Sequence, residues 1–199
     1  MENIFSDKEL SVSRILKETA LKQKAKVFWF TGLSGAGKST LAKSFEEKLM
    51  KAGYTTAILD GDNVRASINK DLGFSLDDRM ENIRRVAHMA KLFRDNGLIA
   101  IVSFISPTNE IRRQAKKIIG ADDFIEVYLN APLAVCEERD VKGLYKKARK
   151  GEIPEFSGIS SPFEIPEEPA LIVQSGTCKL EECADKLFNF SKNFIEQIK

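Results

Sequence analysis

Residues 31–40 read TGLSGAGKST, and this stretch decides the fold of the chain. Its central part, from Gly32 to Ser39, matches the pattern G-x-x-x-x-G-K-[ST], in which backbone N–H groups of a glycine-rich turn surround phosphate oxygens. An apolar run at 27–31 precedes the turn, and residues 38–51 follow it with apolar side chains at helical spacing. The stretch therefore predicts a strand, a phosphate-binding loop and a helix, in that order.

The same alternation continues towards the C-terminus. Further strands are expected at 55–59, 98–105, 124–129 and 170–173, and further helices at 78–96, 112–119, 132–139 and 180–198. Strands that alternate with helices form a parallel sheet whose strand ends meet at one edge, where ligands bind. The predicted fold is α/β, a three-layer αβα architecture of the P-loop NTPase type with a five-stranded parallel sheet.

One domain accounts for most of the chain. Residues 25–199 are expected to form it, and residues 1–24, with a weak helical pattern around Leu10 and Leu16, are expected to be an N-terminal extension. Within the domain, a basic helical patch at 142–150 leads into a segment rich in proline and glycine that ends at residue 169. Residues 142–169 together predict a mobile lid that brings cations over a bound phosphate. A solvated basic helix is the alternative.

Composition argues against several classes of protein. With 31 basic and 29 acidic residues among 199, the formal charge is +2, which favours neither nucleic acid nor a membrane surface as a partner. No apolar stretch is long enough to span a bilayer, and the polar, acidic start does not resemble a signal peptide, so we expect a cytoplasmic protein. Cys136, Cys178 and Cys183 lack the spacing of a zinc site and are expected to be reduced and mostly buried.

The phosphate loop predicts a site for a nucleoside triphosphate with magnesium. Lys38 is expected to neutralise charge on the β- and γ-phosphates, and the hydroxyl of Ser39 to bind magnesium. The helix that opens at Lys38 directs the positive end of its dipole at the same phosphates. The predicted nucleotide-binding residues are Gly32, Leu33, Ser34, Gly35, Ala36, Gly37, Lys38, Ser39 and Thr40.

An acidic turn, Asp60-Gly61-Asp62, follows the second predicted strand and should lie at the same edge as the phosphate loop. One carboxylate there could position an acceptor hydroxyl or magnesium, whereas Asp62 could also cap the helix that follows it. The sequence has no N-K-x-D segment for guanine, so a GTPase is not expected. An acidic residue after the second strand is instead typical of small-molecule kinases.

Arg65, Arg79, Arg84 and Arg85 follow the acidic turn, with Phe74 among them. Guanidinium groups bind anions bidentately and a phenyl ring can stack on a base, which suits an acceptor with both a phosphate and a flat ring. Arginines on long helices are often solvated instead. Arg65 and Arg79, beside the predicted loops, are the stronger candidates.

Several strings, in this order, resemble the adenylyl-sulfate kinase family. They are TGLSGAGKST at 31–40, LDGDNVR at 59–65, DLGFS at 71–75, DRMENIRR at 78–85, SFISP at 103–107, IEVYL at 125–129 and KGLYKKAR at 142–149. The resemblance implies transfer of phosphate from ATP, with Mg²⁺, to the ribose 3′-hydroxyl of adenylyl sulfate (adenosine 5′-phosphosulfate, APS). It also implies a homodimer, and an ATP sulfurylase on a separate chain as a pathway partner.

The resemblance further implies roles for individual residues. Phe74 and Phe156 would sandwich the adenine of adenylyl sulfate, and Asp60 would act at the acceptor hydroxyl or at magnesium. Ser106 corresponds to the position that the family labels a phosphoserine intermediate, so Lys38, Asp60 and Ser106 are the candidate catalytic residues. The implied substrate-binding residues are Asp62, Arg65, Phe74, Arg79, Asn82, Ile105, Ser106, Lys142, Leu144 and Phe156, and the implied magnesium-binding residues are Ser39 and Asp60.

Some alternatives stay open from the sequence. Direct in-line transfer needs only positioning and charge neutralisation, and no general base is recognisable near Ser106, which could then simply line the acceptor pocket. The chain departs from the family's usual pattern at Ala66, Asn109 and Val141, which bears on acceptor affinity and lid geometry. The rival functions are a related kinase with another acceptor, and a regulatory or scaffold protein that keeps the loop without the chemistry. The intact Lys38 argues against the second.

Overall fold

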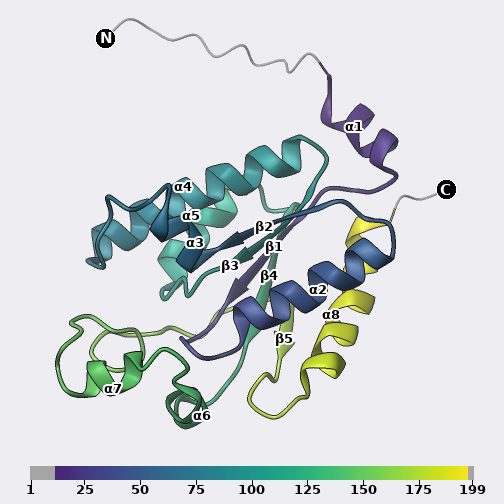
Figure 1. The fold of residues 1–199 in the computed structure, drawn as a ribbon. Coiled ribbons are helices and arrows are strands. Elements are labelled where there is room, and N and C mark those ends of the chain that lie inside the picture. The colour runs from purple at the N-terminus through teal and green to yellow at the C-terminus, as the bar shows by residue number, and fades with distance from the viewer. Residues whose placement is uncertain (1–11, 197–199) are drawn as a thin grey trace, which may run out of the picture.

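The computed structural model describes residues 12–196, which form five strands and eight helices (Figure 1). The strands are β1 Val27–Thr31, β2 Thr56–Asp60, β3 Ile99–Ser103, β4 Phe124–Leu129 and β5 Leu171–Val173. The helices are α1 Arg14–Leu21, α2 Lys38–Lys51, α3 Gly61–Ala66, α4 Leu76–Asp95, α5 Asn109–Ile119, α6 Leu133–Arg139, α7 Leu144–Arg149 and α8 Leu180–Ile195.

The strands form one parallel sheet in the order β2-β3-β1-β4-β5. The strand before the phosphate loop, β1, is central and pairs with β3 through Val27 and Ala100 and with β4 through Val27 and Phe124. Helices α2 and α8 cover one face of the sheet, and α4 and α5 cover the other (Figure 1). The predicted three-layer αβα fold is confirmed, and the carboxyl ends of the strands share one edge.

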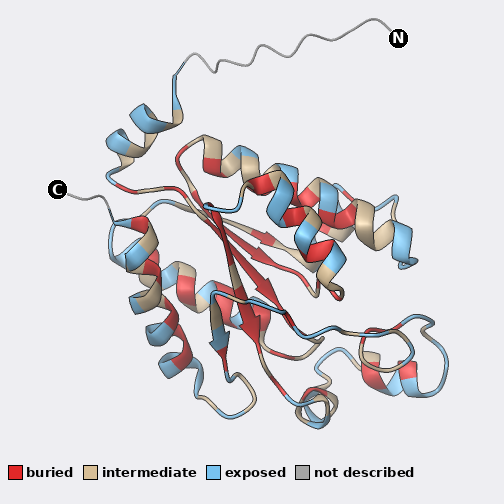
Figure 2. Cartoon of the chain, turned by 180° about the vertical axis from the view of Figure 1, so that it is seen from behind, coloured by how far each residue is buried: buried red, intermediate tan, exposed pale blue. Residues whose placement is uncertain are grey.

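The core consists of two apolar layers, one on each face of the sheet. Side chains of β1 alternate between them, because Phe28 and Phe30 face the layer of α2 and α8, whereas Val27 and Trp29 face that of α4 and α5. All four side chains are fully buried, and Figure 2 shows the central strands as largely buried. A strand that is buried on both faces requires an unbroken apolar sequence, and this is why its bounds could be predicted.

The region after β2 differs from the expectation in two respects. Residues 61–66 form the short helix α3, which begins at Gly61 and therefore earlier than a helix capped by Asp62 would. Asp60, and not Asp62, caps this helix, since Asp60 Oδ1 accepts a hydrogen bond from the backbone N of Asp62 at 3.2 Å. Helix α4 begins earlier than expected, because Ser75 Oγ accepts a hydrogen bond from the backbone N of Asp78 at 3.2 Å.

Part of the predicted N-terminal extension packs at the amino ends of the strands. Arg14 on α1 donates to both carboxylate oxygens of Asp123 at 2.7 and 3.0 Å, and the buried Gln23 donates to the carbonyl oxygen of Gly97 at 2.7 Å. Leu10, which belongs to the weak helical pattern, lies outside the described residues, as do positions 197 and 198 of the expected last helix. No helix within residues 12–196 has the length and apolar character needed to cross a membrane.

Candidate active site

The phosphate loop joins β1 to α2, and its backbone requires glycine. Gly35 and Gly37 have φ angles of 74° and 92°, in the left-handed region that residues with a Cβ rarely adopt. A Cβ on Gly35 would lie 3.0 Å from the carbonyl oxygen of Cys136, and a Cβ on Gly32 would lie 2.8 Å from that of Leu129. Glycine at these positions therefore lets the loop pack directly against the end of β4 and against α6.

Lys38, the first residue of α2, extends into the loop. Its side chain is buried, and its Nζ donates to the carbonyl oxygens of Gly32 and Leu33 at 2.9 and 2.8 Å. Burial disfavours the charged amine and lowers the pKa of Lys38 to about 8. Neutral carbonyl groups satisfy its hydrogen bonds without supplying a counter-charge, so the entry of a phosphate group would stabilise the ammonium form.

Ser39 and Asp60 lie together where β2 ends and α2 begins. Ser39 Oγ donates to Asp60 Oδ2 at 2.6 Å, and the hydroxyl of Ser103, at the end of β3, lies 3.4 Å from Ser39 Oγ. Magnesium takes hydroxyl and carboxylate oxygens as ligands, and it is usually bound through one or two such groups together with substrate phosphates. The donor set at Ser39 and Asp60 therefore fits a magnesium ion.

Arg65 and Arg79 flank the ring of Phe74 at the start of α4. Their guanidinium carbons lie 4.5 and 5.7 Å from the ring centroid, and the phenyl side chain itself is 58% exposed. Arg65 Nη1 donates to the carbonyl oxygen of Gly73 at 2.8 Å, and Arg79 Nε donates to that of Phe74 at 2.8 Å. The structure thus brings the two stronger arginine candidates and the phenyl ring together, in a group that suits a flat base with anionic substituents.

The predicted lid contacts this arginine–phenyl group. Arg79 Nη2 donates to the carbonyl oxygen of Glu155 at 2.8 Å, which places the segment before Phe156 beside the start of α4. The ring of Phe156 is 8% exposed and packs edge-on against a tyrosine of α7, with the ring centroids 5.0 Å apart. At the other end of the lid, Lys142 forms an ion pair with Asp62. The lid is therefore held against both helices that follow β2.

The other predicted acceptor-site residues occupy different environments. Asn82 on α4 is 3% exposed, and its Oδ1 accepts a hydrogen bond from Asn69 Nδ2 at 2.9 Å. Ile105 is half-buried in the loop after β3, where its carbonyl oxygen accepts a hydrogen bond from the hydroxyl of Thr31 at 2.7 Å. Leu144 is half-buried at the first position of α7. Asn82 is thus the most deeply buried of these three side chains.

Ser106 is constrained in both its backbone and its side chain. Its φ of 44° lies in the left-handed region, and the residue is 2% exposed. Its hydroxyl accepts a hydrogen bond from Trp29 Nε1 at 2.9 Å and donates to the carbonyl oxygen of Phe104 at 3.4 Å. In the part of the chain that the structure describes, no carboxylate or imidazole hydrogen-bonds to this hydroxyl. The contacts tie the loop after β3 to the core.

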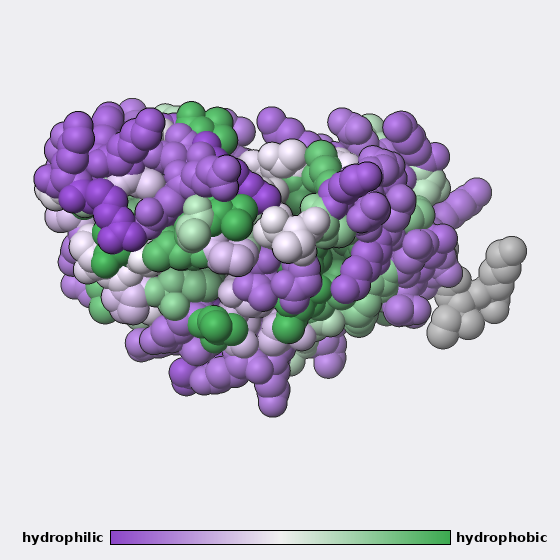
Figure 3. All heavy atoms as spheres, turned by 90° about the horizontal axis from the view of Figure 1, so that it is seen from below, coloured by the Kyte–Doolittle hydropathy of each residue, from purple (hydrophilic) through white to green (hydrophobic). Residues whose placement is uncertain are grey.

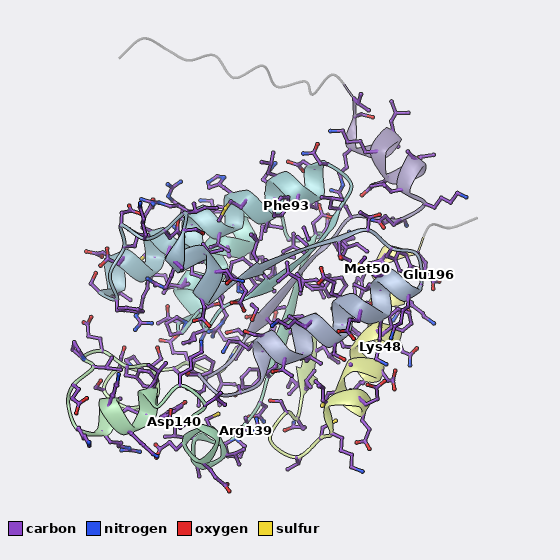
Figure 4. The ribbon with its side chains drawn as sticks, viewed as in Figure 1. Lys48, Met50, Phe93, Arg139, Asp140 and Glu196 are labelled. Carbon is purple, nitrogen blue, oxygen red and sulfur yellow. The ribbon has the colours of Figure 1, made fainter. Side chains whose placement is uncertain are left out.

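Two side chains that support the phosphate loop are not predicted by the sequence. Tyr145 Oη donates to the carbonyl oxygen of Ser34 at 2.9 Å, and Arg139 Nη1 donates to that of Gly35 at 3.2 Å. Arg139 Nη2 also donates to the carbonyl oxygen of Ser175 at 2.8 Å, so this residue links the loop after β5 to the phosphate loop. Figure 4 shows Arg139 at the end of α6. Tyr145 belongs to the string KGLYKKAR, but only the folded chain reveals its partner.

A hollow of about 590 Å³ adjoins the phosphate loop. Its walls come from Leu33 of the loop, Tyr128 of β4, and residues 158–163 and 165 of the lid. Figure 3 views the molecule from below, where hydrophilic side chains predominate and hydrophobic ones gather towards the middle. Because neither Lys38 nor Asp60 contributes to these walls, the hollow lies beside the group of chemically active residues and not around it.

A phosphate loop on β1 whose serine shares a hydrogen bond with an acid at the end of β2 is the arrangement of a P-loop kinase for a small-molecule acceptor. Comparison with known proteins narrows this class. The sequence profile of the family described as adenylylsulphate kinase matches residues 24–174. The adenylyl-sulfate kinase of Bacteroides fragilis is 54% identical over 185 residues, which cover 93% of this chain and 92% of that protein. The chain belongs to the adenylylsulphate kinase family.

Further relatives agree with this assignment. The adenylyl-sulfate kinase of Clostridium acetobutylicum is 53% identical, with 92% of each chain covered. Among solved structures, the APS kinase of Mycobacterium tuberculosis in complex with AMPPNP and APS matches with a TM-score of 0.81 and 46% identity, over 85% of this chain and 98% of that one. A gluconokinase from Sinorhizobium meliloti, 16% identical with a TM-score of 0.58, shares the fold alone.

Proposed function

We propose that this chain transfers the terminal phosphoryl group of ATP to the ribose 3′-hydroxyl of adenylyl sulfate. One observation carries the proposal, namely that Asp60 belongs to both halves of the site. Its Oδ2 accepts a hydrogen bond from Ser39 of the phosphate loop, and its Oδ1 caps α3, the helix that carries Arg65. The relative from Mycobacterium tuberculosis was solved with a triphosphate analogue and APS together, which supports the same pair of ligands here.

The reaction is a single in-line displacement. The 3′-oxygen of the acceptor forms a bond to the γ-phosphorus while the bond from that phosphorus to the β,γ-bridging oxygen breaks, and ADP leaves. Lys38 neutralises charge on the phosphates, and the backbone of the glycine-rich turn orients them. Asp60 either accepts the proton of the attacking 3′-hydroxyl or is a ligand of the magnesium ion. Magnesium, bound through Ser39 and Asp60, would screen the charge that develops on the phosphate oxygens.

The acceptor is held by the arginine–phenyl group and the lid. Phe74 offers an exposed ring for the adenine, and Phe156 would stack on the other face of the base from the lid, whose Glu155 carbonyl oxygen accepts a hydrogen bond from Arg79. Arg65 and Arg79 supply cations for the phosphosulfate, with Lys142 and Asn82 as further ligands of the same substrate. Ile105 and Leu144 complete the apolar wall of this pocket. Closure of the lid excludes water from the phosphoryl group.

Ser106 acts in this proposal through position and not as a nucleophile. Its hydroxyl is already hydrogen-bonded to Trp29, and Arg112 Nη1 donates to its carbonyl oxygen at 2.6 Å. A covalent phosphoserine requires an exposed, activated hydroxyl, whereas in-line transfer requires only that the two substrates meet. We therefore expect Ser106 to shape the loop after β3 that lines the acceptor pocket.

The setting of the reaction is proposed on the same basis. We expect the protein to work in the cytoplasm as a homodimer. Adenylyl sulfate joins a phosphate to a sulfate through an energy-rich mixed anhydride, and we expect an ATP sulfurylase on a separate chain to supply it. The net charge of +2 offers no general attraction for nucleic acid or for a membrane surface.

A coupled kinase assay tests the proposal. With ATP and magnesium, the protein should phosphorylate adenylyl sulfate. For AMP and shikimate as alternative acceptors, kcat/KM should be at least tenfold lower, because neither of them carries the phosphosulfate group. Lys38→Ala should abolish turnover with all acceptors. A faster reaction with AMP or shikimate would show that adenylyl sulfate is not the acceptor. A near-normal rate for Lys38→Ala would contradict the assignment of the phosphate-binding site.

A further inference from the structure

The loop that presents Phe74 is attached to α4 at several points. This Phe74 loop, residues 67–75, joins α3 to α4. A buried hydrogen bond of 2.9 Å connects Asn69 in the loop to Asn82 on α4. Near its end, Ser75 Oγ donates to Asp78 Oδ2 at 2.8 Å. Between these attachments the loop is exposed, and Phe74 lies in this exposed part.

Asp71 provides one more attachment in this exposed part, in addition to the hydrogen bonds that the loop accepts from Arg65 and Arg79. Both of its carboxylate oxygens accept hydrogen bonds from Arg85, from Nη1 and Nη2, each at 2.8 Å. Arg85 is itself held by Glu81 on the same helix, since Arg85 Nε donates to Glu81 Oε1 at 2.8 Å. A bidentate pair whose arginine is already positioned loses less side-chain entropy than an ordinary surface ion pair. The pair therefore restrains the loop more than its exposure suggests.

Arg84 is a natural control for Arg85. It precedes Arg85 on α4, carries the same charge, and also binds Glu81, with hydrogen bonds of 2.6 and 2.9 Å. In the described residues its hydrogen bonds reach only this helical neighbour, so Arg84 does not touch the Phe74 loop. The two arginines thus share the local helix contacts and differ in the contact with Asp71.

From this difference we infer that Asp71 and Arg85 are positioning residues for the acceptor, which hold the Phe74 loop in the conformation that receives the base of adenylyl sulfate. This inference rests on the proposed function. Neither residue touches the triphosphate site, because their partners lie in the loop and on α4. Loss of the pair should therefore weaken acceptor binding and leave the nucleotide and the chemical step unaffected.

Steady-state kinetics of Arg85→Gln and Arg84→Gln test the inference. An exposed ion pair contributes little to the free energy of binding, so Arg85→Gln should raise KM for adenylyl sulfate by only about threefold to fivefold. KM for ATP and kcat should stay within about twofold of the wild type, and Arg84→Gln should leave all three constants within the same range, since a surface substitution away from a site costs little. Glutamine keeps helix propensity and removes the guanidinium group in both variants.

Asp71→Asn breaks the same pair from the loop side. It tests the inference in place of Arg85→Gln if that variant does not fold. It should raise KM for adenylyl sulfate to the same degree, and the double variant should be no worse than either single one, because both remove one interaction. Equal KM values for Arg84→Gln and Arg85→Gln, or a fall in kcat with an unchanged KM, would overturn the inference. A wild-type chain that does not phosphorylate adenylyl sulfate would instead reject the proposed function itself.

Discussion

Replacing Ser106 separates a covalent from a direct phosphoryl transfer. Ser106→Ala removes the hydroxyl that accepts the hydrogen bond from Trp29 Nε1, and leaves that buried N–H without its partner. An unsatisfied buried donor costs about 1–3 kcal/mol of stability. If the hydroxyl is only structural, the variant should unfold at a lower temperature, by roughly 2–4 °C for each kcal/mol in a chain of this size. Its kcat should stay within about tenfold of the wild type, because no bond to Ser106 forms.

Ser106→Gly is the matched control, because the backbone at this position has a φ of 44°. Both variants lose the hydroxyl, but glycine adopts this conformation without the penalty that a Cβ brings, about 1 kcal/mol. The glycine variant should therefore be the more stable of the two by about that amount, with the same kcat. The stability of the protein would then depend on the backbone conformation and the hydroxyl of Ser106, whereas kcat would depend on neither.

Thermal unfolding, steady-state kinetics and mass spectrometry of protein incubated with ATP together measure these effects. The reasoning would be refuted if both variants kept a normal unfolding temperature and normal KM values while kcat fell by more than about a thousandfold, towards the loss of about a millionfold that removal of a catalytic nucleophile causes. A phosphorylated Ser106 peptide that forms and decays at the turnover rate would equally establish a covalent route.

The fold could be predicted where burial imposes a simple pattern. The bounds of β1, β4 and α2 match the expectation residue for residue, because β1 is an apolar run, β4 is apolar apart from Glu126, and α2 has apolar residues at helical spacing. The bounds of helix α3, which the sequence offered only as an alternative, could not be predicted because its six residues, GDNVRA, are too few to show a period. Its start depends on Asp60, whose capping role the sequence does not separate from a role in catalysis.

The candidate site could be predicted as a set of residues but not as a set of contacts. Motif spacing placed Lys38, Ser39 and Asp60 at one edge, since parallel strands bring their carboxyl ends together. Nothing local indicates that Tyr145 donates to the carbonyl oxygen of Ser34, because the two residues are 111 positions apart. Contacts of this kind depend on the path of the whole chain. The hydrogen bond by which the lid supports the phosphate loop could therefore be found only from the structure.

Two further predictions concern the packed N-terminal helix and the phosphate loop. Hydrogen bonds from Arg14 and Lys26 hold the pKa of Asp123 well below its ordinary value despite its burial. Asp123→Asn should therefore lower the free energy of unfolding, measured with urea at neutral pH, by about 3 kcal/mol. The same substitution at the exposed neighbour Asp122 should change it little. For Lys38, burial lowers the pKa to about 8, so the free enzyme loses the ammonium charge as pH rises through that value. kcat/KM for ATP should therefore fall about tenfold for each pH unit above the pKa, because only the protonated amine pairs with the phosphates. At saturating ATP, kcat should stay level over the same range, since the bound triphosphate stabilises the ammonium and raises its pKa. A kcat/KM that does not decline well above pH 8, measured with magnesium in excess, would contradict the view that burial weakens the ammonium form of Lys38 until the nucleotide binds.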